Sequence, residues 1–143
     1  MQSSIYGCGC WAQHSESAGV AVVTSGCGEQ LVQTTLAKTI GQTILERGEP
    51  AFHVKDLMYS EFVHSAMLAD EAENKMGGVL VAYYDPIGQS VDFSLSYTTE
   101  SMVVGYMTTG QAKASVRVSR NASKADQCTV GSGLTIEGFI LNI

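Results

Sequence analysis

The stretch VAVVTSGCGEQLV, which begins at Val20, limits the folds open to this chain more than any other segment. Its first part belongs to a small, β-branched run over 19–24, which predicts a strand buried on both faces and ended by Ser25 and Gly26. Beyond the glycines, apolar residues recur every four positions, which predicts a helix over 29–46. The junction therefore indicates a domain that combines strands and helices.

The remaining segments predict one more helix and then several strands. The four-residue spacing of Val54, Met58 and Phe62 predicts a second helix over 54–69. Turn-forming residues then separate short β-rich runs. These runs predict strands over 78–84, 91–97, 102–107, 114–119 and 134–141. The fold class is α+β, with a strand, two helices and an antiparallel meander. We expect the later strands to form one sheet, with the helices as an antiparallel pair on its outer face.

Composition and charge exclude several classes of function. The chain has 143 residues, 45% of them hydrophobic, which suits one globular domain. Its net charge of −6 and the absence of a basic cluster argue against direct binding to nucleic acid. No apolar run approaches the roughly 20 residues that span a bilayer, and the first residues do not resemble a signal peptide. We therefore expect an intracellular protein of the cytoplasm or nucleus, with no membrane association.

The cysteines and histidines offer weak candidates for chemistry. Cys8, Cys10 and His14 could supply zinc ligands, but a closed site needs four ligands and no second pair has suitable spacing. We therefore expect no metal and reduced thiols. The other histidines, His53 and His64, stand in no known nucleophile motif, so structural or surface roles are the simpler interpretation.

The junction itself allows three interpretations. The free N–H groups of a first helical turn, unshielded at glycine, form a site for a carboxylate or a phosphate. Alternatively, Gly26 and Gly28 serve only a tight turn between strand and helix. A helix N-terminus also lowers a thiol pKa, so Cys27 could be reactive, although a small side chain packed beneath a turn is the simpler view.

Several segments together resemble a known family. They are YGCGCWA at 6–12, TSGCGE at 24–29, TTESM at 98–102, VGYM at 104–107 and IEG at 136–138. In this order they closely resemble the C-terminal part of the β subunit of taspase, the threonine aspartase. Taspases are N-terminal nucleophile (Ntn) hydrolases related to the plant-type asparaginases.

The resemblance implies a four-layer αββα sandwich made by a precursor that cuts itself into an αβ heterodimer. It implies a threonine protease whose N-terminal threonine is nucleophile and, through its own amine, base. The implied activity is cleavage of proteins after aspartate, with no metal or organic cofactor. The implied partners are a taspase α subunit, or full-length taspase, and the protein substrates. Ser25 and Gly26 match the family residues that line the substrate pocket.

The departures from the family pattern concern the catalytic groups. The family nucleophile lies in a Thr-Val-Gly segment after Asp-Gly, upstream of the position of Tyr6, and no such segment precedes Tyr6 here. The three letters at 129–131 match it only by coincidence. The family's Gly-Arg-Val-Gly element, whose arginine binds the substrate carboxylate, is also missing, and none of Arg47, Arg117 and Arg120 replaces it by position.

We therefore interpret residues 1–143 as a single partial domain of a β subunit that carries part of the substrate pocket, contains no catalytic residue and is inactive alone. One alternative is a non-catalytic truncated form that binds taspase chains as a competitor or scaffold. Another is a thiol or metal module built on Cys8, Cys10 and Cys27.

Overall fold

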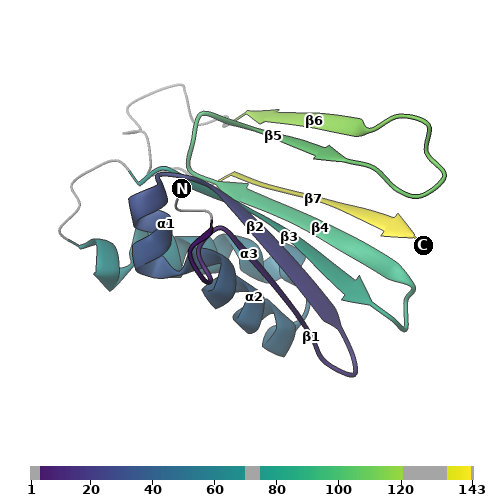
Figure 1. Cartoon of the computed structure of the whole chain (residues 1–143), viewed down its shortest axis with the longest axis horizontal. Coiled ribbons are helices and arrows are strands. Elements are labelled where there is room, and N and C mark those ends of the chain that lie inside the picture. The colour runs from purple at the N-terminus through teal and green to yellow at the C-terminus, as the bar shows by residue number, and fades with distance from the viewer. Residues whose placement is uncertain (1–3, 70–74, 121–134, 143) are drawn as a thin grey trace.

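The computed structural model describes residues 4–69, 75–120 and 135–142. The chain forms two antiparallel sheets, with the helices gathered on one face of the larger sheet (Figure 1). The elements in chain order are β1 (Cys10–His14), β2 (Gly19–Gly26), α1 (Gly28–Thr34), α2 (Leu36–Arg47), α3 (Pro50–Met58), the π-helical turn η2 (Tyr59–Val63), the 3₁₀ turn η3 (Ala66–Leu68), β3 (Gly77–Asp85), β4 (Ser90–Tyr97), β5 (Ser101–Tyr106), β6 (Ser115–Arg120) and β7 (Thr135–Asn142). The predicted α+β class is confirmed. Within these described ranges, no helix has the length and apolar character needed to cross a membrane.

The larger sheet has the strand order β1-β2-β3-β4-β7. Strands β3 and β4 form the predicted hairpin, in which Gly78 pairs with Tyr97 and Asp85 with Ser90. The prediction of one sheet for the second half of the chain is wrong, because β5 and β6 pair only with each other. The strand β1 was not predicted, and it lies beside β2 at one edge.

The strand β2 buries only one face, so the prediction that both faces are buried is wrong. Its residues alternate: Val20 and Val22 are 4% and 1% exposed, whereas Val23 is 48% exposed. The buried side faces the helices, and we call the opposite side of the larger sheet its inner face, because the β5–β6 hairpin covers part of it (Figure 1).

The predicted helix over 29–46 is two helices. Thr35 adopts a left-handed conformation, with φ +43°, and separates α1 from α2. The expected apolar stripe lies in α2, where Leu36, Ile40 and Ile44 are fully buried against the sheet. The break turns α1 so that a different set, Gln30, Leu31 and Thr34, is buried.

The second helical region begins earlier than predicted and ends sooner. Pro50 is the first residue of α3, a position where its missing N–H costs no hydrogen bond. The helix gives way to the π turn at Tyr59, although Val54, Met58 and Phe62 are all buried as expected. The helices α2 and α3 contact each other and lie on the same face of the larger sheet.

The β5–β6 hairpin packs on the inner face over β4 and its neighbours (Figure 1). Leu95, Tyr97 and Val104 are the buried residues of this second core, with Leu80 and Met102 packed against them. The layers in order are helices, larger sheet and hairpin, and the hairpin leaves the inner face uncovered toward β1 and β2 (Figure 1).

The strand β4 is unusual because its helix-facing side is polar. Ser94 and Ser96 are 1% and 0% exposed, and with Asp92 they present buried oxygens that lack a hydrogen-bond partner among the described residues. The equivalent positions on β3, Val79 and Val81, are apolar and fully buried.

Candidate functional site

Ser25 lies at the end of β2, on the inner face of the larger sheet. It pairs with Gly78 of β3, which in turn pairs with Tyr97 of β4, so the three residues lie side by side across the sheet. Ser25 is exposed, and its hydroxyl makes no hydrogen bond to another described residue. The hydroxyl is therefore free to contact a bound molecule.

Gly26 is required by a close backbone approach. Its φ is +152°, and a Cβ atom there would lie 2.3 Å from the carbonyl oxygen of Met76 and 2.6 Å from the Cα atom of Gly77. The same contact includes a hydrogen bond of 2.7 Å from the N–H of Cys27 to the carbonyl of Met76. This packing explains the first glycine of the junction without a ligand, while the residue remains exposed at the surface beside Ser25.

The segment TTESM lies at the same end of the sheet as Ser25. Thr98 is buried and accepts a hydrogen bond of 3.0 Å from the N–H of Gly77, while its own hydroxyl lies 2.6 Å from the carbonyl oxygen of Lys75. These bonds join the end of β4 to the start of β3. The fold thus brings together two segments of the family resemblance, 24–29 and 98–102, that are far apart in the sequence.

The glycines at the start of β3 create room for this arrangement. A Cβ atom on Gly78 would lie 2.6 Å from the sulfur of Met102 and 2.9 Å from the Cβ atom of Tyr97. A Cβ atom on Gly77 would lie 2.6 Å from the ring of Phe62 on the helical side. The backbone at the start of β3 is therefore packed closely against these side chains, and the exposed Ser25 lies beside it.

The candidate zinc ligands are not brought together. Cys10 and His14 are the first and last residues of β1, so their Cα atoms lie about 13 Å apart along an extended strand. Cys8 is buried, whereas Cys10 is exposed. Over the described ranges, no three His, Cys, Asp or Glu residues form a group that could hold a metal ion.

The other candidate residues lie on different elements. Cys27 is exposed at the start of α1, a helix of only seven residues. His53 lies within α3, and His64 packs against the ring of Tyr59, with 4.2 Å between ring centroids. Within the described residues, neither histidine makes a hydrogen bond to Ser25 or Cys27, so no nucleophile and base are paired among them. The predictions at 129–131 and Cys128 lie outside the described residues.

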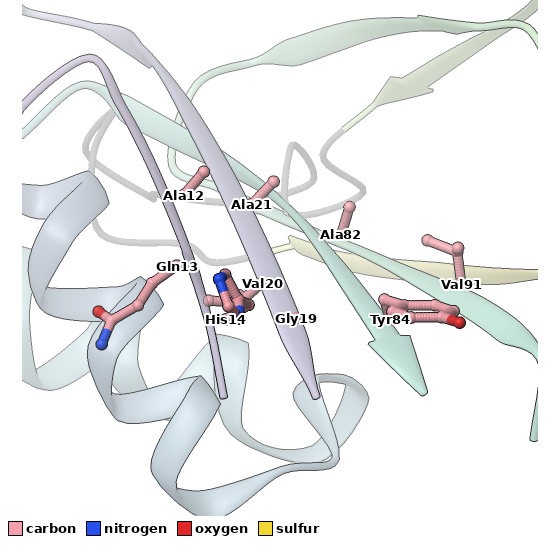
Figure 2. Close-up of a pocket in the computed structure, with 9 residues that line it drawn as sticks. All are labelled: Ala12, Gln13, His14, Gly19, Val20, Ala21, Ala82, Tyr84 and Val91. Carbon is pink, nitrogen blue, oxygen red and sulfur yellow. The ribbon is translucent and has the colours of Figure 1, made fainter. Parts of the chain in front are cut away.

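A hollow at the opposite end of the inner face was not predicted. It has a volume of about 360 Å³ and lies beside Gly19, at the other end of β2 from Ser25. Figure 2 shows Ala12, Ala21 and Ala82 projecting from the same side of β1, β2 and β3, where they occupy one row across the sheet. We call this hollow the alanine trough. Its lining residues are Ala12, Gln13, His14, Gly19, Val20, Ala21, Ala82, Tyr84 and Val91.

A comparison of the chain with models of known protein families finds no match.

Proposed function

We propose that this chain is part of the β subunit of a taspase-type threonine endopeptidase, which cleaves proteins after aspartate in the cytoplasm or nucleus. The observation that carries the proposal is the placement of Ser25. Its exposed hydroxyl has no hydrogen bond to a described residue and lies on the inner face, beside the segment that contains Thr98. In this proposal Ser25 and the backbone at Gly26 contact the substrate, while the nucleophilic threonine comes from a segment absent from this sequence.

The layer order supports the finer proposal of an αββα sandwich. Helices, the larger sheet and the β5–β6 hairpin follow one another as the first layers of such a sandwich would (Figure 1). The hairpin exposes Val103, Val116 and Val118 on its outer side, and each is about 60% exposed. In the complete enzyme, further helices and strands from the α subunit would cover this side and the rest of the inner face.

The experiment that tests the proposal restores the missing parts. The chain is joined to an upstream Asp-Gly-Thr-Val-Gly segment and co-expressed with a taspase α subunit, and cleavage of a peptide after aspartate is measured. We expect cleavage that is lost when the new threonine is replaced by alanine and when the aspartate of the peptide is replaced by asparagine. Correct assembly without cleavage would overturn the proposal.

A second candidate function is that of a non-catalytic binding protein that competes with active β subunits. The uncovered inner face and the position of β1 at an edge of the larger sheet favour it, because both offer contacts to another chain. Binding of the chain to an isolated taspase α subunit, with loss of activity of the active enzyme in the same mixture, is the expected result. Binding without any effect on activity would leave only the scaffold role.

A further inference from the structure

The segment 75–77, which enters β3 beside the end of β2, is held by hydrogen bonds to three other parts of the chain. The N–H of Met76 donates to the side-chain Oε1 of Gln30 over 3.0 Å. The carbonyl of Met76 accepts the 2.7 Å bond from the N–H of Cys27. The backbone of Met76 is therefore bound to α1 through its N–H and to the junction between β2 and α1 through its carbonyl.

Thr98 holds the residues on either side of Met76. Its hydroxyl donates to the carbonyl of Lys75 over 2.6 Å and accepts from the N–H of Gly77 over 3.0 Å. The N–H of Thr98 also donates to the carbonyl of Gly77 over 2.9 Å. One threonine therefore connects the two neighbours of Met76 and ties both to the end of β4.

Both side chains that hold this segment are polar and buried. Gln30 is 5% exposed and Thr98 is 2% exposed. Because a buried polar group left without its hydrogen-bond partner is costly, these bonds favour one position of the segment. Gly26 rests on that position, since a Cβ atom there would lie 2.3 Å from the carbonyl oxygen of Met76. A shift of Met76 therefore moves Gly26 and, with it, Ser25.

We propose that Gln30 and Thr98 are positioning residues of the substrate site, which hold the backbone of Met76 so that Ser25 and Gly26 are in place to contact the substrate. This inference rests on the proposed function, in which the nucleophile comes from another segment. Neither positioning residue touches the substrate in this arrangement. Their loss therefore weakens substrate binding, while the chemical step on the bound substrate keeps its rate.

The first test measures the backbone of the chain itself. Thr98→Val keeps the shape of the side chain and removes the hydroxyl, so hydrogen exchange at the amide of Cys27 should become about tenfold faster. Exchange at Val22, in the middle of β2, should be unchanged, which excludes a general loss of stability. Thr98→Ser returns the hydroxyl and should restore slow exchange. Unchanged exchange at Cys27 in Thr98→Val would overturn the proposal.

The second test measures cleavage by the reconstituted enzyme of the proposed function. We expect Thr98→Val and Gln30→Met each to raise KM about tenfold with kcat within about threefold of the wild type, and Thr98→Ser to keep the wild-type KM. A variant that only lost folded enzyme would show a lower kcat at an unchanged KM. Thr99→Val is the matched control, because the Thr99 hydroxyl donates at the surface to the carbonyl of Ser101 over 3.0 Å, and it should change neither constant.

The outcomes separate this inference from the proposed function. If the wild-type enzyme cleaves the peptide and Thr98→Val has an unchanged KM, the inference is overturned and the proposed function stands. If the wild-type enzyme assembles but cleaves nothing, the proposed function fails, and the substrate role of Gln30 and Thr98 fails with it.

Discussion

The side-chain hydroxyls of Tyr97 and Ser119 lie 2.5 Å apart and form a buried hydrogen bond between the two sheets. Tyr97 belongs to β4 and is fully buried, while Ser119 belongs to β6 and is 2% exposed. Together with the apolar contacts of Val104 and Met102, this bond fixes the hairpin over the larger sheet. The position of the hairpin in turn determines how much of the inner face is open.

Loss of this hydrogen bond should destabilise the protein. Ser119→Ala leaves the Tyr97 hydroxyl buried without this partner, so we expect the free energy of unfolding to fall by about 1–3 kcal/mol. Tyr97→Phe removes the other hydroxyl and keeps the ring. In urea denaturation, the double variant should lose less stability than the sum of the two single variants. Additive losses would show that the two hydroxyls act independently.

Ser96, on the polar side of β4, should respond to replacement by alanine in the opposite way to Ser119, without a loss of stability. Ser96 is fully buried and its hydroxyl has no partner among the described residues. Since an unpartnered buried hydroxyl costs about 1–3 kcal/mol, Ser96→Ala should maintain or raise the free energy of unfolding. Ser119→Ala is the matched control with a hydrogen-bonded hydroxyl. A clear loss of stability in Ser96→Ala would instead indicate that Ser96 binds a partner in solution, such as an internal water molecule.

The break between α1 and α2 stores backbone strain. Thr35 is β-branched and has φ +43°, a conformation that favours glycine. We expect Thr35→Gly to raise the free energy of unfolding by about 1 kcal/mol. Thr43→Gly is the control, because Thr43 lies within α2, where glycine lowers stability by about 1 kcal/mol. A thermal melt of the two variants should show shifts of opposite sign.

The close packing at the start of β3 leaves no room for a side chain. A Cβ atom on Gly77 would lie 2.6 Å and 2.8 Å from atoms of the Phe62 ring. Gly77→Ala should therefore lower the midpoint of chemical denaturation, with a loss of about 1–3 kcal/mol. Gly105→Ala provides the comparison, since the nearest atom to its added Cβ is 4.0 Å away, and it should have little effect. Equal effects of the two substitutions would contradict this account.

Ser25 should matter for activity and not for folding. Its hydroxyl is exposed and makes no hydrogen bond within the described structure, so Ser25→Val should unfold at the same temperature as the wild type. In the reconstituted enzyme of the proposed function, we expect the substitution to abolish cleavage. Ser60→Val, on the exposed surface of the helical side, is the control. Unchanged turnover in Ser25→Val would remove this residue from the substrate pocket.

Local patterns in the sequence predict most of the elements but not how they associate. Alternation and turn residues place β3, β4 and β7 within a residue or so, because those signals act over a few neighbouring positions. The helical spacing of Leu36, Ile40 and Ile44 is equally clear. The break at Thr35 could not be predicted, because the apolar spacing continues through it. The left-handed conformation of Thr35 instead goes with the burial of Gln30, Leu31 and Thr34 in α1.

The candidate site is likewise predicted only in part: the sequence identifies its residues but not which of them lie together. The sequence marks Ser25 and Gly26 as a junction, but only the pairing with Gly78 and Tyr97 shows that Ser25 belongs to the inner face. The alanine trough depends on residues 12, 21 and 82 meeting in register across three strands. Each alanine alone is unremarkable in sequence, so no local signal predicts the hollow. The separate β5–β6 sheet likewise depends on long-range contacts that periodicity does not contain.

The pairing of β7 with β4 has a consequence for the order of folding. The register runs from Ser90 with Asn142 to Tyr97 with Thr135, so β7 pairs with a strand that precedes it by the whole β5–β6 segment of the sequence. Closing such a long loop is slow compared with forming the adjacent β3–β4 turn. During synthesis, β4 therefore emerges as an edge strand with unpaired backbone groups, and it keeps that edge until β7 leaves the ribosome. Over that interval β4 is open to pairing with a wrong partner, as β1 is at the other edge.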